Sequence, residues 1–148
     1  MPRSLLLLLY TLVLFQIAIE DRKYQKIRNV QIKKILILAL AGCFMMPEIT
    51  IGSRVFGMFA VSVPMMVVNC IRPGSFGGGD LKLVFACGAF LGDKMLIFGT
   101  LGGILAAGIY AVYLLWRKKS KNTRFALGPF LSFGYVSAVI CLICKKML

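Results

Sequence analysis

Long apolar runs separated by short polar connections occupy most of this chain, and they constrain its fold more than any other feature. The chain has 148 residues, of which 59% are hydrophobic, and its mean hydropathy is +0.87. These values exceed what a soluble domain of this length uses, so the bilayer is the expected solvent. We predict an all-α membrane protein, a polytopic bundle in which residues 1–148 form a single integral-membrane domain.

Six apolar segments mark the expected transmembrane helices: 4–19, 30–46, 55–71, 81–92, 95–116 and 125–144. The fourth is short for a span of about 20 residues, so we expect its helix to begin in the preceding glycine run. The first has Arg3 as a basic flank, as a signal peptide would, but no small-residue cleavage site follows it. We therefore expect it to be a helix of the mature protein.

The distribution of basic residues predicts the orientation of these six helices. Thirteen of the 18 basic residues fall at the connections between the first and second, third and fourth, and fifth and sixth helices. By the positive-inside rule this face is cytoplasmic and both termini are extracytoplasmic. The net charge of +13 then favours anionic membrane lipids as partners, and nothing indicates nucleic-acid binding. The residues on the basic face are Arg22, Lys23, Lys26, Arg28, Lys33, Lys34, Arg72, Lys82, Arg117, Lys118, Lys119, Lys121 and Arg124.

Carboxylates are rare in this chain, which makes each one informative. There are five, Glu20, Asp21, Glu48, Asp80 and Asp93. The topology puts Glu48 and Asp93 in extracytoplasmic loops beside Arg54 and Lys94, where we expect solvated roles. The other three share the cytoplasmic face. Adjacent helical residues point about 100° apart, so Glu20 and Asp21 cannot converge on one water, and a pairing with Asp80 is favoured.

Two carboxylates can hydrolyse a peptide bond without a metal, one ionised to activate water and one protonated to polarise the carbonyl. Asp80 follows a glycine run beside an apolar segment, where an ionisable group is costly and therefore a candidate functional residue. Alternatively, Asp80 is a helix N-cap. Asp21 is alternatively a solvated charge paired with Arg22 or Lys23.

Other catalytic chemistries find little support in the sequence. The chain has no histidine, which excludes Ser-His and Cys-His mechanisms and histidine-containing zinc sites. We expect no metal and no cofactor. Cysteines in apolar segments behave as small hydrophobes, and although two have a Cys-x-x-Cys spacing, they lack a thioredoxin-like context. The five are Cys43, Cys70, Cys87, Cys141 and Cys144.

Three motifs together resemble one family. The segment from Glu20 to Asn29 resembles the first aspartate motif of prepilin peptidases, in which an aspartate after the first helix precedes an Ile-Pro-Asn turn. Here Arg28 stands at the proline position. Gly77-Gly78-Gly79-Asp80-Leu81-Lys82 is similar to the family's second motif, Gly-x-Gly-Asp-x-Lys. Phe125-Ala126-Leu127-Gly128-Pro129-Phe130 is similar to the Gly-Pro-Phe entry of its last helix.

This resemblance implies an aspartic endopeptidase with Asp21 and Asp80 as catalytic residues. Its expected substrates are type IV pilin-like precursors with a short basic leader, cut at the cytoplasmic side of a prokaryotic inner membrane just before a hydrophobic helix. Larger members carry an N-terminal cytoplasmic insertion associated with methylation. Only seven residues lie between Asp21 and Asn29, too few to hold that insertion, so we expect cleavage without methyl transfer.

The resemblance also selects supporting residues, each with a structural alternative. Gly77 and Gly79 admit the substrate backbone or form a flexible loop. Lys82 favours the anionic form of the pair or reaches lipid head groups. Asn29 holds the turn after Asp21 or caps the second helix, and Gly128 and Pro129 begin the last helix. Two other function classes remain open: a small ion or proton-coupled transporter, and a non-catalytic assembly factor of a pilus or secretion system.

Overall fold

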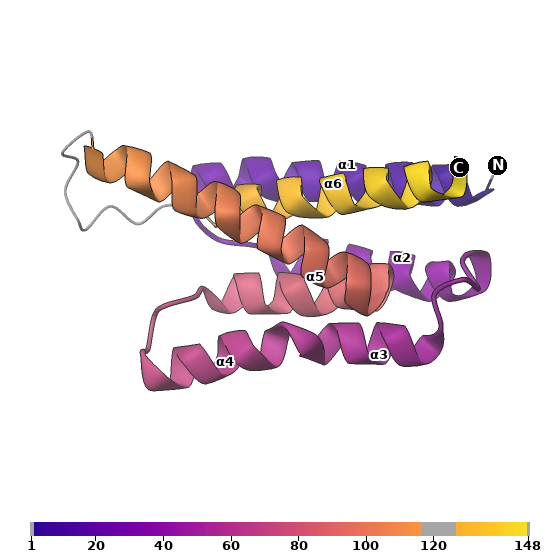
Figure 1. The fold of residues 1–148 in the computed structure, drawn as a ribbon, viewed down its shortest axis with the longest axis horizontal. Helices are drawn as coiled ribbons and strands as arrows, with labels where there is room; N and C mark the ends of the chain where they lie inside the picture. Colours follow the sequence, from indigo (N-terminus) through magenta and orange to yellow (C-terminus); the bar gives the residue numbers. More distant parts are fainter. Residues whose placement is uncertain (1, 117–126, 148) are drawn as a thin grey trace.

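The computed structural model describes residues 2–116 and 127–147, and in these ranges all regular secondary structure is α-helical (Figure 1). Three segments are long and apolar enough to cross a membrane, namely Arg3–Tyr24, Ile51–Ile71 and Gly78–Leu114, and Gly128–Cys144 is a shorter apolar helix. The expected all-α membrane fold is thus supported, whereas the count of six spans stays a prediction. The helices are α1 (Pro2–Tyr24), α2 (Asn29–Met45), α3 (Ile51–Ala60), α4 (Ser62–Ile71), α5 (Gly78–Trp116) and α6 (Gly128–Met147).

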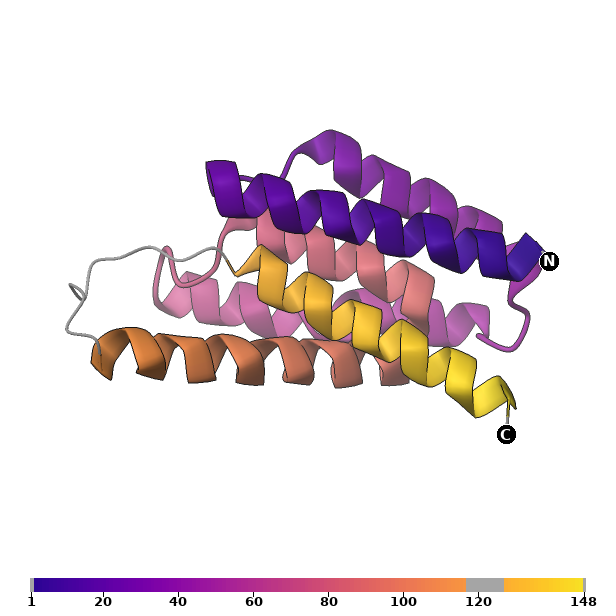
Figure 2. The same cartoon turned by 90° about the horizontal axis from the view of Figure 1, so that it is seen from above.

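Helix α5 reverses direction partway along its length, as Figures 1 and 2 both show, and the break lies at Gly92. Gly92 has φ 75° and ψ −179°, a backbone conformation that is essentially restricted to glycine. A Cβ atom at this position would also lie 2.7 Å from the hydroxyl of Ser53. The reversal therefore separates two antiparallel halves at the boundary expected between the fourth and fifth apolar segments. As expected, the first half begins inside the glycine run, at Gly78.

The third apolar segment differs from the prediction. We expected one helix over 55–71, but the helix begins at Ile51 and is interrupted at Val61, which separates α3 from α4. Pro64 explains the interruption, since proline has no N–H to donate and its ring clashes with the carbonyl four residues earlier, here that of Ala60. The next N–H, that of Met65, pairs with Val61 O at 3.1 Å and restarts the helix.

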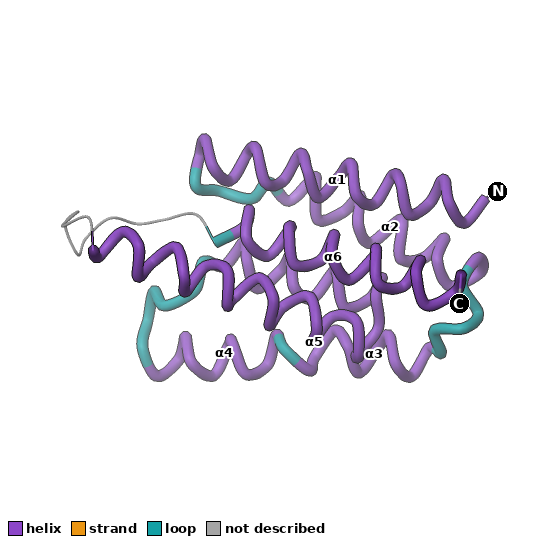
Figure 3. The backbone as a smooth tube through the Cα atoms, turned by 45° about the horizontal axis from the view of Figure 1, so that its top comes forward, coloured by secondary structure: helices purple, strands orange, loops and turns teal. Residues whose placement is uncertain are grey.

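The two ends of the bundle carry different parts of the chain. Both termini lie at one end, and so does the 46–50 connection between α2 and α3 (Figure 3). The 25–28 connection between α1 and α2 and the 72–77 connection between α4 and α5 lie at the other end. Both contain basic residues of the expected cytoplasmic face. Five other residues of that face, Arg117, Lys118, Lys119, Lys121 and Arg124, fall outside the described ranges.

Glycines let the backbones of α3 and the first half of α5 approach closely. A Cβ on Gly57 would lie 2.8 Å from the carbonyl carbon of Gly92, and a Cβ on Gly88 would lie 2.5 Å from the carbonyl oxygen of Gly57. Small residues at such a contact favour helix association in a membrane, where packing replaces the hydrophobic driving force. This contact fixes the first half of α5, which carries Asp80 at its beginning.

The position of Arg54 differs from the one that we expected. We expected it beside a loop, yet it lies within α3 and is only 2% exposed. Its guanidinium donates to the carbonyls of Ala89 at 2.9 Å and Phe90 at 3.1 Å in α5. It also donates to Gly42 and Met46 at the end of α2, at 2.9 and 3.3 Å, and to Ile49 at 3.3 Å. Arg54 thus joins three helices.

Candidate active site

A cavity of about 440 Å³ opens at the end of the bundle that carries the 25–28 and 72–77 connections. Both Asp21 and Asp80 line it, although 58 residues lie between them in the chain. The remaining lining comes from the two connections and the helix starts that follow them. These residues are Gln25, Lys26, Ile27, Arg28, Asn29, Gly77, Gly78, Gly79 and Lys82.

Asp21 lies within α1. We expected this helix to end before Glu20, but it continues to Tyr24. The helix ends where Gln25 adopts φ 49°, with its N–H donating to the carbonyl of Asp21 at 2.8 Å. The Asp21 side chain is only 5% exposed, and its Oδ2 accepts a hydrogen bond from the N–H of Gly128 at 2.9 Å. The alternative of a solvated charge is therefore wrong.

The contact between Asp21 and Gly128 leaves no space for a side chain at position 128. A Cβ at Gly128 would lie 2.5 Å from Oδ2 of Asp21, so the close approach requires glycine. Pro129 follows in the first turn of α6, where proline is tolerated. The backbone N–H groups of the next two residues, Phe130 and Leu131, both donate to Leu127 O at 3.1 Å. The N–H of Gly128 has no partner within α6 and donates to the Asp21 carboxylate. A helix N-terminus favours an anion at this position.

Asp80 is the third residue of α5 and is partly buried. The N-cap alternative is wrong for this residue, since Gly77 precedes the helix. The side chain reaches back instead and accepts a hydrogen bond from the Gly77 N–H, in the manner of an acidic residue at the third helical position. Asp80 also interacts electrostatically with Asp21. The two carboxylates thus line the same cavity, and the charge of Asp21 acts on Asp80.

The three consecutive glycines before Asp80 are not equivalent. A Cβ at Gly77 would lie 3.0 Å from Oδ2 of Asp80, and a Cβ at Gly79 would lie 3.1 Å from the Cβ of Ile27. A Cβ at Gly78 would meet nothing within 4 Å. Gly77 and Gly79 are therefore the positions where a side chain would disturb the cavity, in agreement with the two glycines selected from the motif.

Asn29 and Lys82 meet at the rim of the cavity. The ammonium of Lys82 donates to Oδ1 of Asn29 at 3.4 Å, and both side chains are exposed. The residue before α2 is Arg28, and no side-chain hydrogen bond caps this helix. The expectation that Asn29 caps the second helix is therefore wrong. Its side chain links α2 to α5 instead.

The pair Glu20 and Gln31 was not selected from the sequence. The Gln31 side chain is 6% exposed, and its Nε2 donates to Oε1 of Glu20 at 3.2 Å. This contact ties α2 to α1 immediately before Asp21. The sequence could have singled out Gln31, because it is an amide at the start of an apolar segment. Its partner could not be predicted, because it depends on how α1 and α2 pack.

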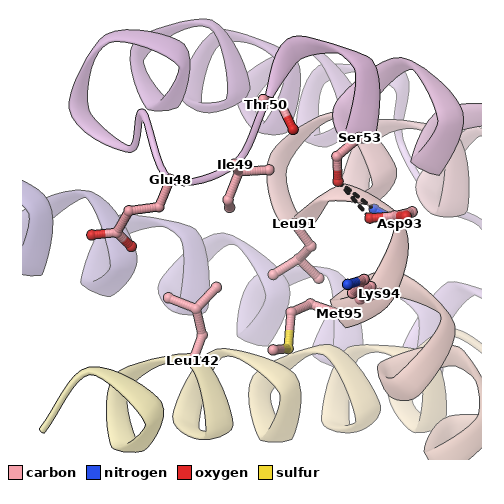
Figure 4. Close-up of a pocket in the computed structure, with 9 residues that line it drawn as sticks. All are labelled: Glu48, Ile49, Thr50, Ser53, Leu91, Asp93, Lys94, Met95 and Leu142. Carbon is pink, nitrogen blue, oxygen red and sulfur yellow. Dashed lines mark hydrogen bonds between the residues drawn. The ribbon is translucent and has the colours of Figure 1, made fainter.

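A second cavity, of about 600 Å³, lies at the opposite end of the bundle, around Glu48 and Asp93 (Figure 4). Its two carboxylates are separated and have other partners. Glu48 pairs with Arg3 at 2.7 Å. Asp93 accepts a hydrogen bond from the Ser53 hydroxyl at 2.5 Å, and the N–H of Asp93 donates to the same hydroxyl at 3.3 Å. This end of the bundle therefore lacks a coupled carboxylate pair among the described residues.

The first cavity has the chemistry for general acid–base catalysis. Like charges in one poorly solvated cavity repel each other, so such a pair favours a state with one carboxylate and one protonated carboxyl. Across the described part of the chain, no group of three or more His, Cys, Asp and Glu side chains could hold a metal ion. The cysteines at positions 43, 70, 87, 141 and 144 are free thiols, and only Cys87 is buried.

Comparison with known proteins gives one match. The model of the type IV leader peptidase family matches residues 8–112, which is more than two thirds of the chain and includes both aspartates. Gly128 and Pro129 lie beyond the matched range. No curated protein and no solved structure gave a significant match.

Proposed function

Because the chain belongs to the type IV leader peptidase family and is thus a protease related to prepilin-processing enzymes, we propose that Asp21 and Asp80 are its catalytic pair. The proposed activity is an aspartic endopeptidase that removes the short basic leader from type IV pilin-like precursors. The observation that carries this proposal is that the two aspartates line one cavity. We further propose that this cavity faces the cytoplasm and that the chain performs no methyl transfer.

The proposed reaction needs only the two carboxyl groups and one water. The ionised carboxylate accepts a proton from the water, whose oxygen forms a bond to the carbonyl carbon of the scissile peptide. The protonated carboxyl donates its proton to the carbonyl oxygen. When the tetrahedral intermediate collapses and its C–N bond breaks, one of its hydroxyls returns a proton to the carboxylate that had protonated the carbonyl oxygen, and the leaving amine takes up the proton that the other carboxyl gained from water. One new carboxyl terminus and one new amino terminus result.

Backbone donors hold both carboxylates for this reaction. The Gly128 N–H holds Asp21, and the Gly77 N–H holds Asp80. Hydrogen bonds to a charged group are stronger than neutral ones, so each donor stabilises an ionised state of its carboxylate. Neither donor needs a side chain, which leaves room for an extended substrate backbone beside the glycine run.

Coexpression with a pilin-like precursor tests the proposal. Processing should be lost in both Asp21→Asn and Asp80→Asn, because each substitution removes one of the two proton-transfer groups while keeping the side chain's shape. Gly102→Ala is the matched control, since its added methyl group meets nothing within 4 Å and it lies away from the cavity, and it should process the precursor normally. Leader removal by either well-folded aspartate variant would contradict the pair.

Precursor processing and a measurement of ion flux together separate the alternative functions. An assembly factor would bind the precursor and leave its leader intact in the wild-type chain. A transporter would show ion flux in vesicles that depends on Asp21 or Asp80 and would not shorten the precursor.

A further inference from the structure

The 72–77 connection reaches the aspartate cavity at Gly77, and this residue is in direct contact with Asp80. The Gly77 N–H donates to the Asp80 side chain, and the Gly77 carbonyl accepts the N–H groups of Asp80 at 3.0 Å and Leu81 at 3.3 Å. A Cβ at Gly77 would lie 3.0 Å from Oδ2 of Asp80. The position of Gly77 therefore decides where the Asp80 carboxylate lies in the cavity.

A side chain of α4 holds the backbone immediately before Gly77. Asn69 lies in the last turn of α4 and is partly buried. Its Oδ1 accepts hydrogen bonds from the N–H of Gly74 at 3.2 Å and from the N–H of Phe76 at 3.3 Å. An amide oxygen has two lone pairs, so both bonds form together. The Phe76 ring packs against the hydrophobic core, so this residue is held both by its backbone and by its side chain.

The other hydrogen bonds within the connection do not involve Gly77. Ser75 donates from both its N–H and its hydroxyl to the carbonyl of Arg72, at 3.2 and 2.8 Å. Gly74 has φ 85°, which glycine adopts without strain. The run from Gly77 to Gly79 has no stiffness of its own, because glycine has more backbone freedom than any other residue. The bonds to α4 therefore supply the anchor that the glycine run lacks.

We propose that Asn69 is a positioning residue for Asp80, and this inference rests on the proposed function. Asn69 is not among the residues that line the cavity, so it acts through Phe76 and Gly77. Without its oxygen, two backbone N–H groups lose their acceptor, and Gly77 loses its fixed position. The Asp80 carboxylate then moves with Gly77, and misplacement of a reacting group by about 1 Å lowers a rate by up to about 100-fold.

Kinetics of leader removal by the full chain in membranes test the role of Asn69. Asn69→Leu has a side chain of similar size without an acceptor, and it should lower kcat about tenfold while KM stays within about twofold of wild type, because a misplaced carboxylate slows the reaction without changing substrate binding. Asn69→Asp keeps an oxygen at the same place and should retain kcat within about threefold of wild type.

Cys70→Leu is the matched control, because it changes the exposed neighbour of Asn69 on α4. It should leave both kinetic constants unchanged. An unchanged kcat in Asn69→Leu would overturn the proposal. The same loss of kcat in Asn69→Asp as in Asn69→Leu would also overturn it, because the oxygen acceptor would then not be the cause.

Amide hydrogen exchange of the same full-length variants tests the positioning without cleavage. In Asn69→Leu the amides of Gly74 and Phe76 should exchange at least about tenfold faster, because their acceptor is lost. The amide of Gly77 should also exchange faster, although its partner is Asp80 and not Asn69. Faster exchange confined to Gly74 and Phe76 would show that Asn69 only stabilises the connection, and it would overturn the proposal.

The two measurements separate this inference from the proposed function. If the wild-type chain removes no leader, the proposed function is rejected, and the exchange rate of the Gly77 amide still decides whether Asn69 positions Asp80. If the wild-type chain removes the leader and Asn69→Leu does so at the same rate, the positioning role alone is rejected.

Discussion

Single residues around Asp21 decide how its carboxylate is held. Gly128 contributes a backbone donor at 2.9 Å and leaves no space for a side chain. Arg28, which stands at the family's proline position, has φ −77°, within the range that proline itself adopts. The backbone at Arg28 is therefore compatible with proline.

Gly128→Ala should slow leader removal by about tenfold to 100-fold, because the methyl group displaces the Asp21 carboxylate and misplacement of about 1 Å has effects of this size. Gly102→Ala is the control, since Gly102 has open space around its Cβ position. The check is the rate of leader removal in membranes containing equal amounts of each variant. Equal rates for both variants would show that the Asp21 position tolerates displacement.

Arg28→Pro should leave processing within twofold of wild type and stabilise the fold by about 0.4–1 kcal/mol, because it restricts the unfolded chain at a compatible φ. The loss of the Arg28 to Glu20 contact, at 4.0 Å with Arg28 largely exposed, should matter little. Gln25→Pro is the contrasting variant, since φ 49° is incompatible with proline. Thermal unfolding in detergent measures both, and a lower Tm in Arg28→Pro would contradict the inference.

At the scale of helices, the end of the bundle that carries both termini is organised around the reversal of α5. Gly92 turns the backbone, Ser53 and Asp93 exchange two hydrogen bonds beside it, and Arg54 binds carbonyls on α2 and α5. These carbonyls lie near helix C-terminal ends, where a cation is favourable. The arrangement fixes the first half of α5 against α3, and through it the position of Asp80 at the other end.

Arg54→Met should lower the free energy of unfolding by at least about 2 kcal/mol, because several buried carbonyls lose their donors. Arg72→Met replaces an exposed arginine in the same way and should change stability little. Thermal unfolding of the purified variants gives the comparison. If the two variants unfold at the same temperature, the hydrogen bonds of Arg54 do not stabilise the fold.

At the scale of the whole molecule, both termini and the 46–50 connection lie at one end, and the aspartate cavity lies at the other. The cavity end carries Lys26, Arg28, Arg72 and Lys82. Basic residues beside helix ends favour the cytoplasmic, anionic leaflet. We propose that this charge distribution orients the molecule and also binds anionic lipids.

Cysteine labelling checks this orientation in a chain whose five native cysteines are replaced. A cysteine at Ser75, in the 72–77 connection, should react in intact cells only with a membrane-permeant reagent. A cysteine at Thr50, at the opposite end, should react with an impermeant reagent as well. The reverse pattern would place the aspartate pair on the extracytoplasmic side and contradict the proposed site of cleavage.

Several features of the fold and of the site could be predicted from the sequence because they depend on local composition. Apolar segments predicted helices, and the glycine motif singled out Gly77 and Gly79, although it did not predict that Gly79 lies against Ile27. Pro64 indicates the break at Val61 from the sequence alone, but we predicted one uninterrupted helix over 55–71. The helix-capping alternative for Asn29 and the position expected for Arg54 beside a loop were wrong, because the contacts of both residues depend on partners that are distant in the chain.

The sequence by itself determined the helical membrane class, the rarity of carboxylates and the motifs that single out Asp21 and Asp80, since these follow from residue type and local spacing. Only the tertiary structure decided that Asp21 is buried against Gly128 and that Asp21 and Asp80 line one cavity. The physical reason is that burial and coupling are properties of packed helices. Residues 21, 80 and 128 come together only when α1, α5 and α6 pack.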